Sequence, residues 1–304
     1  MNTFPRGMLP VLSIALAAFA VGHLQTAITA QSPPVPPIEL VRRTVQNEIR
    51  SNSDDTKFMF RVRRETPRGS QTRLMVQTSE AIAAVTVAVN DRPLNPQQLH
   101  AEEARLQHLM EHPDELSKKR KQEKEDAERV TRIMKALPDA FLYEYAGIEQ
   151  GRRGVGKEGD ELVHLSFRPN PDYNPPSRVE QVLTGMQGTI LIDEPKLRIA
   201  RIDGTLAKQV GFGWGMLGHL DRGGHFLVEQ ADMANNHWEI TRIDLSFTGR
   251  LLLFKGLNIK SNEIYDDFHR VPSGLTFAQG VELLKKQEAV LAQKPDSEEK
   301  EKPK

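Results

Sequence analysis

The sequence predicts an α+β protein that consists mainly of antiparallel β-structure. From Phe141 to Phe254, short segments with an apolar residue at every second position recur at roughly even intervals, separated by Gly, Pro, Asn and Asp. Such alternation is typical of strands with one buried face. Helical periodicity occurs only before Pro138 and near the C-terminal end. This distribution favours a meandering antiparallel sheet or barrel over βαβ units.

The first 30 residues have the pattern of a secretory signal peptide. Arg6 supplies a positive charge, the run from Met8 to Val21 is largely apolar, and Ile28-Thr29-Ala30 fits a cleavage site. The run is short for a membrane span, and no later segment approaches eighteen apolar residues. We therefore expect an exported protein, periplasmic or secreted, that is not transmembrane after cleavage. An uncleaved N-terminal anchor is the alternative.

A Pro-rich linker is predicted over residues 31–37, followed by a single domain over residues 38–292. The domain opens with an amphipathic helix at 40–49, where apolar residues recur at helical spacing. Strands are predicted next at three segments rich in alternating or β-branched residues: 58–63, 73–78 and 83–89.

A charged helical hairpin is predicted as an insertion over residues 95–137. Asn95-Pro96 is a helix-start signature, and Pro113 interrupts the apolar pattern and separates two helices. No residue from Ser117 to Asp126 is apolar, so we expect the hairpin to project into solvent. Its basic residues are candidate contacts for a partner protein: Lys118, Lys119, Arg120 and Lys121.

The remaining strands are predicted at seven segments with a period of two: 141–145, 162–167, 188–193, 197–202, 226–230, 238–247 and 251–254. A last helix then places Phe277, Val281 and Leu284 on one face. Residues 293–304 are rich in charge and poor in apolar residues, which predicts a disordered tail.

Composition excludes several kinds of site. Lys plus Arg and Asp plus Glu both number 41, so the formal net charge is zero. This balance argues against nucleic acid as a partner, because phosphate-binding surfaces need a basic excess. The chain has no cysteine, which excludes disulfides, a thiol nucleophile, a thiolate metal site and the lipid-anchored cysteine of a lipoprotein.

Three segments resemble nucleotide-binding or metalloprotease motifs but lack the context that those motifs require. Residues 151–157 match the glycines and lysine of a P-loop, but Glu158 replaces the Ser or Thr and a strand follows instead of a helix. Residues 213–218 match a dinucleotide-binding pattern without the required helix. His108–His112 fits an inverted zincin motif, but on a solvated helix. A second histidine cluster lacks a further neutral donor: His219, Asp221 and His225. We therefore predict no enzyme activity, no metal and no cofactor.

The order of turns and strand ends from Pro93 to Pro272 is similar to that of a known group of proteins. It is carried by Asn90–Leu94, Leu137–Phe141, Phe167–Pro171, Gly188–Asp193, Gly211–Gly213, Gly223–Phe226, Trp238–Thr241 and Gly249–Phe254. This order resembles a poorly characterised group of exported bacterial proteins related to the lipoprotein-sorting carriers of LolA/LolB-like fold. The resemblance implies an unclosed antiparallel half-barrel with helices over its concave face, enclosing an apolar cavity that binds acyl chains in the carriers.

The resemblance further implies a non-catalytic carrier or sensor in the cell envelope, whose partner is a lipid or an acylated protein. Candidates for the cavity lining are large apolar residues: Phe212, Trp214, Met216, Leu217, Phe226, Trp238, Phe247 and Phe254. Ordinary core packing is the alternative for each. The alternative function is an envelope scaffold that fills the cavity with its own side chains and binds another envelope protein through the charged hairpin. An unrecognised hydrolase is the third hypothesis.

Overall fold

The structure is a computed structural model that describes residues 35–51, 55–212, 218–234, 236–251 and 255–293. The predicted signal peptide, the linker up to residue 34 and the tail from residue 294 lie outside the described residues.

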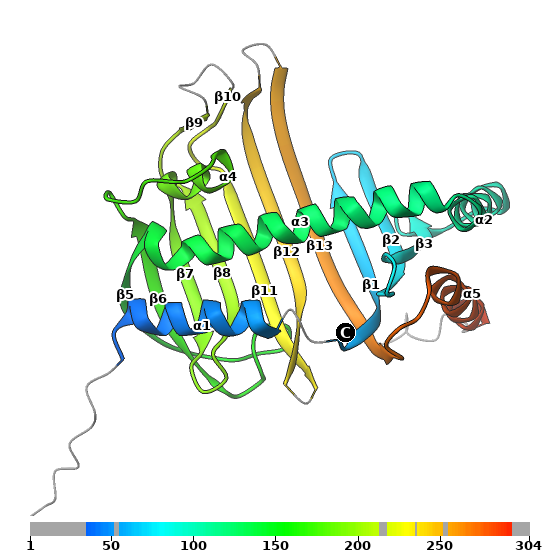
Figure 1. Cartoon of the computed structure of the whole chain (residues 1–304), viewed down its shortest axis with the longest axis horizontal. Coiled ribbons are helices and arrows are strands. Elements are labelled where there is room, and N and C mark those ends of the chain that lie inside the picture. The colour runs from blue at the N-terminus through cyan, green and yellow to red at the C-terminus, as the bar shows by residue number, and fades with distance from the viewer. Residues whose placement is uncertain (1–34, 52–54, 213–217, 235, 252–254, 294–304) are drawn as a thin grey trace, which may run out of the picture. The chain divides into compact units, whose positions relative to one another are not determined.

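The described residues form one antiparallel, unclosed sheet (Figure 1). Its strands are β1 Lys57–Thr66, β2 Gly69–Val76, β3 Ala83–Val89, β4 Arg92–Pro93, β5 Phe141–Gln150, β6 Glu161–Pro169, β7 Met186–Asp193, β8 Arg198–Leu206, β9 Val210–Phe212, β10 Gly218–Leu220, β11 His225–Ala234, β12 His237–Leu251 and β13 Lys255–Val271. The order is β4-β3-β2-β1-β13-β12-β11-β8-β7-β6-β5; β10 also pairs with β12, and β9 pairs with β10. The predicted fold class, mainly antiparallel β and unclosed, is confirmed.

The helices are α1 Pro37–Ser51, α2 Pro96–Glu111, α3 Pro113–Ala140, the short α4 Arg178–Gln181 with the 3₁₀ turn η1 Val182–Gly185, and α5 Phe277–Gln293. The predicted start of α2 is confirmed by a capping box. Asn95 Oδ1 accepts a hydrogen bond from the Gln98 N–H at 2.9 Å, and Gln98 Oε1 accepts one from the Asn95 N–H at 3.0 Å. Both backbone groups are thereby satisfied at the helix start.

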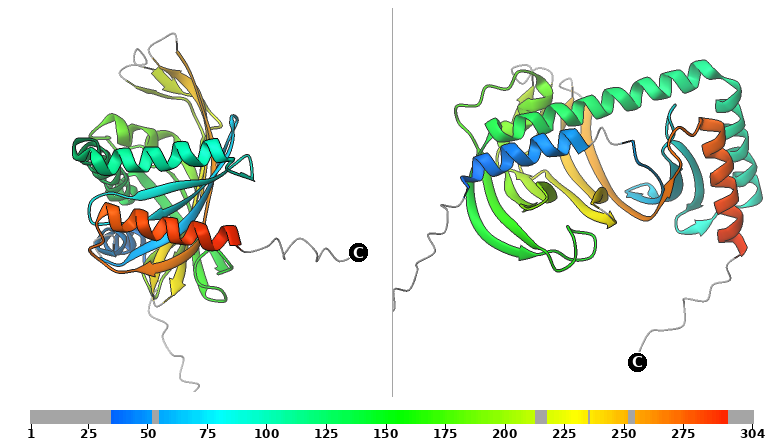
Figure 2. Two further views of the ribbon diagram at one scale, coloured as in Figure 1. Left: turned by 90° about the vertical axis from the view of Figure 1, so that its right-hand side faces the viewer. Right: turned by 60° about the horizontal axis from the view of Figure 1, so that its bottom comes forward.

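Helices α1 and α3 cross the same face of the sheet side by side (Figures 1 and 2). Both are amphipathic: α1 buries Leu40, Val41 and Val45, and α3 buries Leu137 in the same core. This core also contains side chains of β5 to β8, such as Leu165 and Ile190. A helix that turns one apolar stripe toward a sheet is the ordinary way to cover such a face.

The prediction that the two helices form a hairpin projecting into solvent is wrong. The two helices form, but only His112 separates them, and they diverge rather than run back along each other (Figure 2). Helix α2 instead packs on a second core formed with β2, β3 and α5, where Leu106, Leu74 and Leu284 are buried. The prediction overlooked that a few apolar residues at each end of the pair suffice to dock both helices on the sheet. The stretch from Ser117 to Asp126 is mostly exposed, as its composition predicts.

Strand β13 was not predicted. Of the strand expected at 251–254, Leu251 ends β12 and the other residues lie outside the described part. Strand β13 has 17 residues and pairs with β12 on one side and β1 on the other. Most of its side chains are exposed or half-buried, so its sequence lacks the alternation of a strand with one buried face.

Candidate functional site

A cavity of about 1330 Å³ lies between the covered face of the sheet and the helices α1, α3 and α4. Its lining is largely apolar. On α3, the lining residues Val130, Ile133, Met134 and Leu137 are spaced three or four apart, so one helical face closes the cavity. On the sheet, β11 and β12 supply Val228, Ile240, Ile243 and Leu245 among others.

Four of the eight predicted lining residues line this cavity: Phe212, Phe226, Trp238 and Phe247. The other four lie outside the described residues: Trp214, Met216, Leu217 and Phe254. For all eight residues, contact with a ligand remains a prediction. Sequence reasoning identified the aromatic residues because large apolar side chains on strands point to a covered face, but it did not identify the contribution of α3.

Two glycines make room for the aromatic rings. A side chain at Gly204 would collide with the ring of Phe226, and one at Gly224 would collide with the ring of Phe247. Neither glycine has a left-handed φ, so the requirement is space rather than backbone conformation. The rings therefore lie against the sheet and leave the volume above it open.

Trp238 has two roles in the fold. It lines the cavity and is also buried in a small core with Leu162, Leu191 and Ala200. The guanidinium of Arg198 lies 5.6 Å from the centre of its ring, a cation–π contact. Core packing was the alternative prediction for Trp238, and its burial in this small core agrees with that alternative as well.

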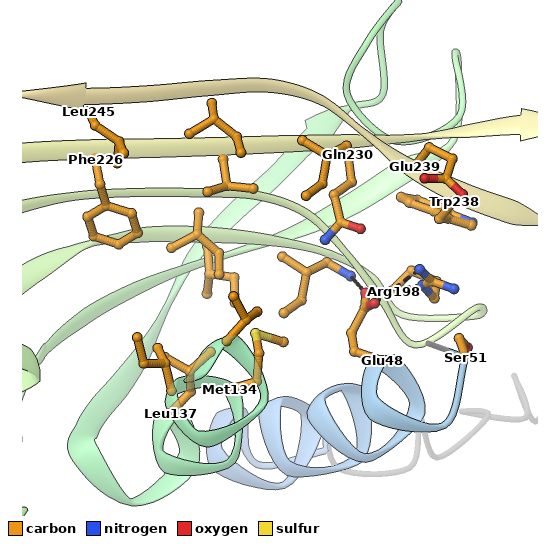
Figure 3. A pocket seen from close by; sticks show the side chains of 18 of the residues that line it. Glu48, Ser51, Met134, Leu137, Arg198, Phe226, Gln230, Trp238, Glu239 and Leu245 are labelled. Atoms are coloured by element: carbon orange, nitrogen blue, oxygen red, sulfur yellow. Dashed lines mark hydrogen bonds and ion pairs between the residues drawn. The ribbon is translucent and has the colours of Figure 1, made fainter. Parts of the chain in front are cut away.

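One end of the cavity is polar (Figure 3). Glu48 of α1 and Arg198 of β8 form a buried ion pair, with Arg198 Nη2 3.0 Å from Glu48 Oε2. Glu48 Oε1 accepts hydrogen bonds from Arg198 Nε at 3.1 Å and from the Ile199 N–H at 2.7 Å. Burial raises the pKa of Glu48, while the charge of Arg198 and these hydrogen bonds oppose the rise.

Glu239 of β12 lies at the same end. Within the described part of the chain its carboxyl group makes neither a hydrogen bond nor an ion pair. Burial raises its pKa from 4.5 to about 7, against the lowering charges of Arg198 and Lys57. A carboxyl group with this pKa is partly protonated at neutral pH.

The cavity opens to solvent beside α3. Val130 lines the cavity although its side chain is 57% exposed. Near the C-terminal end of α1 and the turn between β2 and β3, the lining becomes polar and includes Ser51, Gln77 and Thr78. These residues form a polar rim of the cavity.

The predicted partner-binding residues lie on α3, and none of them lines the cavity. Lys118, Arg120 and Lys121 are exposed, whereas Lys119 pairs with Glu123 of the same helix. Glu123 Oε2 also accepts a hydrogen bond from the Ile82 N–H at 3.1 Å. Lys119 therefore takes part in the contact between α3 and the turn before β3. The other three of the four predicted basic residues lie on the exposed surface.

Residues 213–217 of the dinucleotide-binding pattern lie outside the described residues, and the other sequence motifs occupy structural positions. Residues 151–157 lie in the turn between β5 and β6, where Gly154 and Gly156 have positive φ. His219 pairs with Asp221 at 3.3 Å, but His225 pairs with Asp203 at 3.0 Å, so this predicted cluster is divided. His108 stacks on His112 with ring centres 3.8 Å apart. Among the described residues, no group of three or more His, Asp or Glu side chains is arranged to hold a metal.

No helix within the described residues is both long and apolar enough to cross a membrane. A comparison with known protein families found none that matches this chain, and no curated protein sequence matches it. Among solved structures, the chain is similar to a DUF1329 family protein from Desulfovibrio piger, with 8% sequence identity and a TM-score of 0.29. That alignment covers 80% of this chain and 97% of the other. Similarity at this level carries no argument about family or ligand.

Proposed function

We propose that this protein is a non-catalytic binding protein for an apolar ligand, a lipid or a lipidated protein, and serves as a carrier or sensor in the cell envelope. The observation that carries the proposal is the apolar cavity of about 1330 Å³. Small-molecule sites are typically about 300–1,000 Å³, so this cavity has room for a long acyl chain. The envelope location is proposed from residues 1–30, which lie outside the described part.

Binding would be driven by transfer of the acyl chain from water to the cavity. Each buried CH₂ group contributes about 0.8 kcal/mol. Helix α3 covers one side of the bound chain, because its residues Ile133, Met134 and Leu137 lie over the lining strands, and the ligand enters and leaves at the opening beside it. The open volume supports a carrier more than a scaffold that fills its own cavity.

The test is native mass spectrometry of the protein purified from envelope extracts, followed by lipid identification. Val228 lies on the sheet side of the cavity, and its replacement by Trp reduces the volume of the cavity. Ile259→Trp is the matched control, because Ile259 is 40% exposed and does not line the cavity. We expect an acyl lipid in defined stoichiometry on the wild type and on Ile259→Trp, and its loss from Val228→Trp. An apo mass that no added lipid shifts would contradict the proposal.

A hydrolase is the second candidate, favoured by one observation. Glu239, with its pKa raised to about 7, lies in the cavity with the lining residue His237, and a carboxyl group with this pKa suits general acid–base catalysis. The same purified protein is incubated with a long-chain acyl ester and the released fatty acid is measured. Turnover that Glu239→Gln abolishes would replace the carrier proposal with a catalytic one.

A further inference from the structure

The polarity of the cavity is divided along its length. Figure 3 places Glu48, Arg198 and Glu239 toward one end and Phe226 and Leu245 toward the other. An amphiphile that enters such a cavity buries its chain against the aromatic end. Its head group then lies at the polar end, because a charged or hydrogen-bonding group is not stable against apolar side chains.

Most charges at the polar end already have partners. The Glu48 carboxylate is held by two guanidinium nitrogens of Arg198 and by the Ile199 N–H. Lys57 pairs with Asp55 at 3.4 Å. An anionic head group would therefore have to compete with a carboxylate already in place for either cation.

Glu239 is different, since its carboxyl group has no hydrogen-bond or ion-pair partner within the described residues. An ionised carboxylate only accepts hydrogen bonds, and a partly buried acceptor without a donor is unfavourable. Gln230, whose amide both donates and accepts, points into the cavity nearby (Figure 3). Glu239 thus lacks a hydrogen-bond donor of its own, although the charges of Arg198 and Lys57 reach it, and Gln230 offers an amide for a second polar contact.

We propose that the polar end is a head-group subsite that selects an amphiphile with a primary ammonium group, paired with the carboxylate of Glu239. This inference rests on the proposed function and adds the ligand's head-group class and its orientation. The chain lies toward Phe226 and Leu245, and the ammonium donates hydrogen bonds to Glu239.

The experiment compares three ligands with the same twelve-carbon chain, dodecylamine, dodecanol and dodecanoate, in calorimetric titrations of the purified, delipidated protein at pH 8. At this pH an alkylammonium is charged, as a lysine side chain is, and Glu239, with a pKa of about 7, is mostly ionised. We expect dodecylamine to bind about tenfold or more tightly than the other two, the range of a charge-assisted hydrogen bond.

Glu239→Gln keeps the shape of the side chain and removes its charge. We expect it to weaken dodecylamine binding about tenfold and to leave dodecanol binding unchanged. Glu144→Gln is the matched control, because Glu144 is an exposed residue of β5 that does not line the cavity. Circular dichroism confirms that each variant is folded, and the ligand comparison on the wild type needs no variant.

The outcomes separate this inference from the proposed function. Dodecanoate binding as tightly as dodecylamine, or Glu239→Gln leaving the amine affinity unchanged, overturns the head-group assignment while the apolar cavity remains a binding site. No binding of any of the three ligands overturns the proposed function, and the head-group assignment with it.

Discussion

At the scale of single residues, Glu239 links the cavity to pH. Because burial raises its pKa from 4.5 to about 7, the folded protein keeps a proton over a range in which the unfolded chain has released it. The contribution of protonated Glu239 to the stability of the folded protein is fully present below about pH 4.5 and is lost as the pH rises through about 7. The free energy of unfolding should therefore fall across this window.

Glu239→Gln should remove that fall, because glutamine mimics the protonated acid at every pH. We predict that the variant is about 3 kcal/mol more stable than the wild type at pH 8 and within about 0.5 kcal/mol of it at pH 4.5. Urea unfolding at the two pH values measures the difference. The other ionisable side chains at this end are common to both proteins: Glu48, Lys57, Arg198 and His237. Parallel stability curves for the two proteins would show that burial does not raise the pKa of Glu239.

Sequence analysis predicted the aromatic residues of the cavity lining but did not identify Glu239. Phe226 and Phe247 are large apolar residues on strands, and such residues point to a covered face. Glu239 follows Trp238 in a strand segment and has no local feature that marks it as partly buried. Its environment depends on Arg198 of a different strand and Lys57 from the start of β1, and only the tertiary fold brings these together.

At the scale of elements, α1 is held on the sheet by polar as well as apolar contacts. Asn47 Nδ2 donates hydrogen bonds to the carbonyl oxygens of Lys196 at 3.1 Å and Leu197 at 3.2 Å, beside the Glu48–Arg198 pair. These contacts fix the C-terminal end of α1 next to the polar end of the cavity.

We predict that Glu48→Ala destabilises the protein by about 3–5 kcal/mol, because it leaves the charge of Arg198 buried without a partner. The double variant Glu48→Leu with Arg198→Met should recover most of that loss, since replacing both charges by apolar groups is close to neutral. Chemical unfolding of the two variants measures both effects. If the double variant is less stable than Glu48→Ala, the loss comes from packing of α1 rather than from the unpaired charge.

Element types follow from local patterns, while their arrangement does not. The apolar stripe of α1 and the Asn95 capping signature of α2 are local, and both helices begin within a few residues of their predicted starts. The path of α3 over the cavity depends on contacts with α1 and β5 that no local pattern contains. Sequence analysis missed strand β13 for a related reason. This strand is held by hydrogen bonds to two neighbouring strands rather than by a buried face.

At the scale of the whole described unit, the two largest cores lie on different parts of one sheet. The larger core lies under α1 and α3, and the smaller one lies among β2, β3, α2 and α5. Strand β13 joins them, since it pairs with β1 of the smaller part and β12 of the larger part. Most of the cavity lining belongs to the larger part, and Gln77, Thr78 and Ile82 are its contribution from the β2–β3 region.

This division predicts that the two parts lose stability separately. Leu284 of α5 is fully buried in the smaller core, and Leu165 of β6 is fully buried in the larger core. Replacing either by Ala should cost about 2–5 kcal/mol, because it leaves a cavity in a packed core. We expect Leu284→Ala to raise amide hydrogen exchange in β2, β3 and α5 while an acyl ligand stays bound.

Leu165→Ala is the matched variant, with the same chemical change in the core next to the ligand. It should raise exchange in β6 to β8 and lower ligand retention in native mass spectrometry. Local opening follows the contacts that each segment makes, so separate cores favour separate patterns even within one hydrogen-bonded sheet. If both variants raise exchange over the same strands, β13 couples the two cores into one cooperative unit, and ligand release would then respond to changes anywhere along the sheet.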